Sequence, residues 1–128
     1  MHADEVRVVV VDDVPDVADT LAMQLMLDGY TVVTAYSADE AIRAVERHQP
    51  HCVLLDIGMP GIDGCELAAL LRHRYHDDVV LIAVTGSDET HARVTDTYAL
   101  VDHHLRKPLD TKALRKLLPT LASPGPRD

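Results

Sequence analysis

The run Val8–Asp13 constrains the fold of this chain more than any other feature, because four valines are followed directly by two adjacent carboxylates. A short run of β-branched apolar residues is typical of a strand that is buried on both faces of a parallel sheet. The two acids then lie where that strand stops, and like charges held so close repel each other unless a cation lies between them. Open α/β folds bind their ligands at this carboxyl edge, so the run indicates a metal site there.

Segments with the pattern of strands alternate with segments of helical periodicity along the chain. Strands are predicted at residues 8–11, 31–35, 52–56, 79–84 and 102–106. Each is followed by a predicted helix, and these helices begin at Pro15, at the Ser37–Glu40 capping box, near Glu66, at Ser87 and at Asp110. The repeated unit predicts a three-layer α/β sandwich, in which a parallel sheet with right-handed crossovers carries helices on both faces.

Apolar stripes predict which helix faces are buried. The first helix, which Asp28 and Gly29 are expected to close, carries its stripe at Val17, Ala18, Leu21, Ala22, Leu25 and Met26, and we also assign Met23 to the core. The later stripes lie at Ala41, Ile42 and Val45, at Leu67, Leu70 and Leu71, and at Leu114, Leu117 and Leu118. In the capping box, Ser37 and Glu40 are each expected to accept a hydrogen bond from the other's backbone amide.

Two helices depart from the regular pattern. The helix after Ser87 has a thin stripe, so we expect it to be the least stable. Pro119 lacks an amide and restricts the residue before it, so the last helix either ends early or kinks. We assign residues 1–121 to one domain and residues 122–128, which are rich in Pro and Gly, to a disordered tail or a truncated linker.

Charge and composition exclude several classes of function. The net charge of −9 in 128 residues disfavours direct contact with nucleic acid or anionic membranes. No stretch approaches the roughly 18 apolar residues of a membrane span, and the N-terminus lacks the layout of a signal peptide, so we expect a cytoplasmic protein. Cys52 and Cys65 are too few for a disulfide framework and are expected to be reduced thiols.

Chemically useful side chains follow three further strands. Asp56 ends the third strand as Asp12 and Asp13 end the first, and three carboxylates at one edge form an oxygen site that suits Mg²⁺ or Mn²⁺. Thr85 ends the fourth strand and Lys107 ends the fifth, where a hydroxyl and an ammonium can hold the oxygens of a phosphoryl group. The set therefore indicates a site that places phosphate on an aspartate.

This pattern strongly resembles the receiver domain of bacterial response regulators. The motifs are the acidic pair, Asp56 followed by Met59-Pro60 and Asp63-Gly64, Thr85 followed by a small residue, and Lys107-Pro108. The resemblance spans Val6 to about Leu118. It implies a flavodoxin-like fold, with a five-stranded parallel sheet in the order 2-1-3-4-5.

The resemblance also implies residue roles. Asp56 would be the phosphoacceptor, Asp13 and Asp56 direct Mg²⁺ ligands, Asp12 a ligand through water, and the Gly58 carbonyl a further ligand. Thr85 would bond the phosphoryl group and Lys107 would pair with it. The implied partners are a histidine kinase or histidine phosphotransfer domain and an unknown downstream protein, with no contact to nucleic acid or membrane. Such a domain is a signalling receiver that catalyses its own phosphorylation and dephosphorylation, and it is not an enzyme acting on other substrates.

A switch in receivers commonly uses an aromatic side chain three residues before the lysine, and here that position is His104. We interpret His104 as the switch side chain. The expected partner surface is the face of the fourth helix, fifth strand and fifth helix. Receivers usually have Gly where this chain has Leu100, a residue that disfavours positive φ, so that loop is expected to be strained or differently shaped.

Other interpretations of the same residues stay open. The acidic pair could merely cap the first helix, whose dipole favours anions. Closely spaced histidines, at 48 and 51 and at 73 and 76, raise a zinc site as a remote alternative. A pseudo-receiver that only binds partners and a small Mg²⁺-dependent aspartyl phosphatase of the haloacid dehalogenase kind are the alternative functions, although the phosphatases usually have a second Asp where this chain has Gly58.

Overall fold

The computed structural model describes residues 6–57, 64–85, 99–106 and 110–122. The strands are β1 (Arg7–Val11), β2 (Thr31–Ala35), β3 (Cys52–Asp56), β4 (Val80–Thr85) and β5 (His103–Arg106). The helices are α1 (Pro15–Leu27), α2 (Ala38–His48), α3 (Gly64–Tyr75) and α5 (Thr111–Ala122), with a 3₁₀ turn at His76–Asp78. The helix predicted after Ser87 and residues 123–128 of the predicted tail lie outside the described residues. Residue 122, which was assigned to the tail, is instead the last residue of α5.

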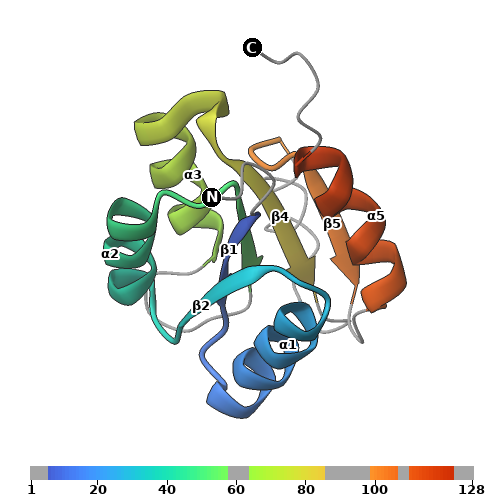
Figure 1. Cartoon of the computed structure of the whole chain (residues 1–128). Helices are drawn as coiled ribbons and strands as arrows, with labels where there is room; N and C mark the ends of the chain where they lie inside the picture. The colour runs from blue at the N-terminus through green and yellow to red at the C-terminus, as the bar shows by residue number, and fades with distance from the viewer. Residues whose placement is uncertain (1–5, 58–63, 86–98, 107–109, 123–128) are drawn as a thin grey trace.

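All strands pair in parallel, and the sheet has the predicted order β2-β1-β3-β4-β5. In Figure 1, α2 and α3 cover one face of the sheet, and α1 and α5 cover the other. The strongly apolar strands fit this arrangement, because a parallel sheet with helices on both faces buries both sets of side chains. The predicted fold class is confirmed.

Alternate residues of each strand enter different cores, because successive side chains point to opposite faces. Val9 and Val11 of β1 pack with α2 and α3, whereas Val8 and Val10 pack with α1 and α5. The same alternation divides β3, where Leu55 joins the first core and Leu54 joins the second. Strands β1 and β3 are therefore fixed from both sides, and they hold rigidly the residues that follow their carboxyl ends.

The buried stripe of α1 is narrower than predicted. Ala18, Ala22 and Leu25 are buried, but Val17 is 45% exposed, Met26 49% and Met23 60%. At about 100° per residue, the three buried positions share a narrow sector, and Val17, Met23 and Met26 lie roughly 70° or more from its centre. The assignment of Val17, Met23 and Met26 to the core was therefore wrong. Leu70 of α3 is also partly exposed, at 37%.

Helix ends agree with the sequence in part. Gly29 has a φ of +102° after α1, as predicted for a left-handed cap. The Ser37 Oγ accepts a hydrogen bond from the Glu40 amide at 3.2 Å, but Glu40 Oε1 accepts from the amide of Tyr36 at 2.8 Å, and not from that of Ser37. The reciprocal capping box was thus half right.

The structure tests two expected irregularities, the end of the last helix at Pro119 and the backbone conformation at Leu100. Helix α5 continues through position 119 to Ala122, so the alternative that it ends before Pro119 was wrong. Leu100 does not have positive φ; among the described residues other than glycine, only Gln49 and His76 do. The carbonyl of Leu100 instead accepts a hydrogen bond from Arg72 Nε at 2.9 Å. No helix among the described residues is long and apolar enough to cross a membrane.

Candidate functional site

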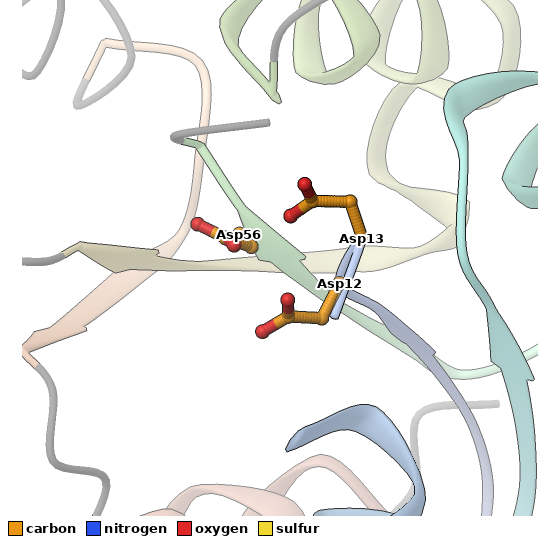
Figure 2. A group of neighbouring side chains, drawn as sticks. All are labelled: Asp12, Asp13 and Asp56. Carbon is orange, nitrogen blue, oxygen red and sulfur yellow. The ribbon is translucent and has the colours of Figure 1, made fainter. Parts of the chain in front are cut away.

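Three aspartates meet at the carboxyl edge of the sheet. Asp56 is the last residue of β3, and Asp12 directly follows β1, whose Val11 pairs with Leu55. Asp13 comes next along the chain, and Figure 2 shows the three side chains around a shared space. Neighbouring parallel strands end at the same edge, so the recurrence of an acid after each strand correctly predicts this cluster.

The carboxylates are close and two of them are buried. Each of the three offers one oxygen that lies within 4.8 Å of the others. Asp12 and Asp56 are only 5% and 6% exposed, whereas Asp13 is more accessible. Two unit charges 4.8 Å apart repel by roughly 3.5 kcal/mol at an effective dielectric constant of about 20. The cluster therefore favours a compensating cation.

The donor set fits a hard divalent cation. Mg²⁺ binds oxygen at about 2.0–2.1 Å, so two ligands on opposite sides of the ion are about 4.2 Å apart. The three oxygens lie within 4.8 Å of one another, a limit only slightly above this spacing. Small movements of the side chains, or one ligand bound through water, would let all three carboxylates bind the same ion. No group of three or more His, Cys, Asp or Glu with this spacing was found elsewhere in the described residues, which include the four histidines considered for zinc.

Asp12 also shapes the turn into α1. Its amide donates to the Ala35 carbonyl at 3.1 Å, and its Oδ1 accepts from the Val14 amide at 3.0 Å. The N-cap residue of α1 is Val14, and no side chain caps this helix. Neither acid is thus the N-cap, and the alternative that the pair merely caps α1 was wrong.

Thr85 lies at the same edge as Asp56. It is the last residue of β4 and is buried, and Val84 pairs with Asp56 in the neighbouring strand. Gly58 and Lys107 lie outside the described residues, so four of the six predicted site residues can be placed. His104 is exposed on β5, where it pairs with Ala83.

A cavity of about 470 Å³ adjoins the acidic cluster. Its lining comes from the ends of the central strands and from one side of α1, and includes Asp12, Asp56, Asp16, Thr20, Leu21 and Gln24. The part of α1 nearest the cluster also exposes Val14 and Val17, at 47% and 45%. Apolar periodicity placed Val17 in the buried stripe of the first helix. It identified neither Val14 nor Val17 as an exposed apolar residue.

The order of the sheet and the acidic cluster define an α/β domain with a cation-type site at its carboxyl edge. A family model described as the response regulator receiver domain matches residues 8–119. The chain belongs to this family, as the sequence resemblance indicated. It is therefore a receiver, a signalling domain of two-component response regulators, with an acidic pocket.

Solved structures agree with this assignment. The response regulator TrrA from Thermotoga maritima, in complex with Mg²⁺-BeF, is 30% identical over 91% of this chain and 98% of that chain, with a TM-score of 0.79. A signal receiver domain from Bermanella marisrubri is 27% identical over 90% of this chain and 96% of its own, with a TM-score of 0.80. NtrX from Brucella abortus, at 24% identity, shares the fold, with a TM-score of 0.79 over 93% of this chain but 26% of its own.

Proposed function

We propose that Asp56 accepts a phosphoryl group from a phosphohistidine on a histidine kinase or a histidine phosphotransfer domain. A lone pair of the Asp56 carboxylate forms the new O–P bond while the N–P bond of the donor breaks. The electrons of that bond return to the imidazole, which then takes up a proton from solvent. The observation that carries the proposal is the buried Asp56 carboxylate within 4.8 Å of Asp12 and Asp13.

The other site residues support this transfer. Asp13 and Asp56 are proposed to hold Mg²⁺ directly with the Gly58 carbonyl, and Asp12 to hold a metal-bound water; Mn²⁺ could substitute. The metal would neutralise charge on the phosphoryl oxygens during transfer. Thr85 is proposed to donate its hydroxyl to one phosphoryl oxygen, and Lys107 to pair with another. The Mg²⁺-BeF complex of TrrA supports a metal in this kind of site.

The exposed apolar residues beside the cluster support a docking position for the donor. The phosphohistidine has to approach Asp56, and Val14 and Val17 lie at the N-terminal end of α1 near that approach. An apolar patch of this kind is typical of a protein contact. We therefore expect V17N, which removes apolar surface without adding a charge, to reduce the rate of phosphotransfer from a histidine kinase that phosphorylates the wild-type chain. Phosphorylation by acetyl phosphate should not change, because that donor needs no docking surface.

Phosphorylation is proposed to change partner binding through the face of the fourth helix, fifth strand and fifth helix, with His104 as the switch side chain. His104 is exposed in this structure, so the switch requires it to turn inward when Thr85 binds phosphate. H104A should abolish the response of this face to phosphorylation. Gly58 and Ser87 are small, so water should reach the acyl phosphate easily, and a bulky residue at position 58 should lengthen its half-life.

The central test is incubation with acetyl phosphate and Mg²⁺, followed by intact-mass measurement. The wild type should gain one phosphoryl group, D56N should gain none, and D28N, at the far end of α1, should behave as the wild type. Turnover of p-nitrophenyl phosphate without stable modification would support the phosphatase alternative. Neither modification nor turnover would support the phosphorylation-independent interaction module.

A further inference from the structure

The second feature with unusual chemistry lies at the amino edge of the sheet, opposite the acidic cluster. His51 directly precedes β3, and its amide donates to the Arg7 carbonyl at 2.8 Å. In return, the Arg7 amide donates to the Nδ1 of the His51 side chain at 3.0 Å. A side-chain nitrogen thus accepts the hydrogen bond that a backbone carbonyl would accept in a regular ladder.

The local path of the chain explains why the Arg7 amide bonds to a side chain and not to a backbone carbonyl. Gln49 ends α2 in the left-handed region, with a φ of 47°, and Pro50 leads into His51. The carbonyl of Gln49 accepts from the Arg7 guanidinium, at 2.9 Å from Nη2 and 3.2 Å from Nε. That carbonyl is therefore engaged by the side chain of Arg7 while the amide of Arg7 is bonded to the imidazole. We call the paired residues Arg7 and His51 the clasp.

The clasp requires one protonation state of His51. An imidazole nitrogen accepts a hydrogen bond only when it carries no proton, so His51 must be neutral, with its proton on Nε2. In the imidazolium form both nitrogens are donors, and the Nδ1 proton would face the Arg7 amide proton. Rotating the ring by half a turn would place a carbon there instead, so it would not restore the bond.

The charged groups around the clasp act in both directions. The Arg7 guanidinium disfavours an imidazolium, while the carboxylate of Asp78 lines the same cavity of about 370 Å³ and favours one. Asp78 is exposed, so solvent screens it. The other neighbours in this cavity, including Tyr75 and Val79, carry no charge at neutral pH. The lost hydrogen bond therefore decides the direction of the effect.

We propose that the clasp is a pH-sensitive device, which closes the amino edge of the sheet when His51 is neutral and opens when His51 is protonated. Histidine ordinarily titrates near pH 6.5. The hydrogen bond from the Arg7 amide to His51 is present above that pH, and it is lost as the pH falls below it. Opening frees the start of β1 and the end of α2. The acidic cluster lies at the other end of β1, about 17 Å away for five residues, so its metal binding should be little affected.

Amide hydrogen exchange followed by NMR tests this proposal. The protection factor of the Arg7 amide in the wild type should fall about tenfold between pH 7.5 and pH 5, which corresponds to about 1.4 kcal/mol. In H51N the amide oxygen can accept the same hydrogen bond but does not titrate, so protection should stay constant. H73N removes an exposed histidine of α3 and should follow the wild type.

Two results would overturn the proposal. One is an Arg7 protection factor in the wild type that does not change over this pH range, or that falls equally in H51N. The other is a nitrogen spectrum of His51 at pH 7.5 that shows a proton on Nδ1. The second measurement uses the wild type alone, so it decides the question even if H51N fails to fold.

Discussion

The acidic cluster predicts that D13N makes the metal-free protein more stable. Asparagine keeps the shape of the side chain but removes one of three negative charges within 4.8 Å of one another. Asp13 is the best position for this change, because it is the most accessible of the three and its neutral amide needs no buried partner. Asp12, by contrast, also accepts a hydrogen bond from the Val14 amide.

The size of the effect follows from the distances. Asp13 takes part in two repulsive pairs, each worth roughly 3.5 kcal/mol at 4.8 Å in an effective dielectric constant of about 20. Solvent around Asp13 screens much of this, so we expect a gain of about 1–2 kcal/mol in the free energy of unfolding. For a chain of 128 residues this gain raises the Tm by about 4–8 °C.

Magnesium should reverse the order of the two proteins. A ligand present at 100 times its Kd stabilises the folded state by about 2.7 kcal/mol, and D13N should lose most of this stabilisation. Thermal unfolding by circular dichroism, with EDTA or with saturating Mg²⁺, measures both effects. E46Q removes an exposed charge from α2 and controls for the change in net charge. A D13N protein that is less stable than the wild type in EDTA, or that gains equally from Mg²⁺, would refute the reasoning.

Three further predictions concern other contacts. R72M should lower the free energy of unfolding in urea by about 3 kcal/mol, because several carbonyls and a carboxylate lose their partner, whereas R74M at an exposed position should change it by less than about 0.5 kcal/mol. Q49G should raise the same quantity by about 0.5–1 kcal/mol, since Gly adopts the left-handed conformation without strain; an unchanged or lower value would contradict this. The Tyr36 hydroxyl donates a hydrogen bond to Asp19, and this bond raises the pKa of Tyr36 above its ordinary value of 10.0. The bond therefore stabilises the fold at lower pH and is lost as the pH rises through the raised pKa. Ultraviolet titration measures the ionisation of the tyrosines, and the difference between the wild type and Y36F isolates Tyr36. This difference should show ionisation above pH 10, and ionisation below pH 10 would contradict the prediction.

The sheet and its acidic edge could be predicted from the sequence because their signals are local. The three central strands, β1, β3 and β4, are short apolar runs buried on both faces, and the acids at the ends of β1 and β3 stand at positions that the strand ends alone determine. The order of the strands, however, came from fold rules and from the resemblance to a family. Periodicity within one strand says nothing about its neighbours.

The burial of α1 could not be predicted in the same way. Its stripe is apolar over a wide arc, and only the packing against β1 and β2 decides which part is covered. Met23, Met26 and Val17 look like core residues in sequence and are exposed in the structure. The clasp escaped prediction for a related reason, because His51 and Arg7 are 44 residues apart and no local pattern couples them.

The parallel direction of all five strands has a consequence for how this chain can change over evolution. It places the acidic cluster of Asp12, Asp13 and Asp56 at one rim of the molecule and the Arg7–His51 clasp at the other. Substitutions at the clasp rim can adjust folding strength and acid tolerance while the reactive rim keeps its geometry. A spectroscopic label attached at His76, in the exposed 3₁₀ turn His76–Asp78, would exploit the same separation, since it would report on opening of the clasp at a distance from Asp12, Asp13 and Asp56.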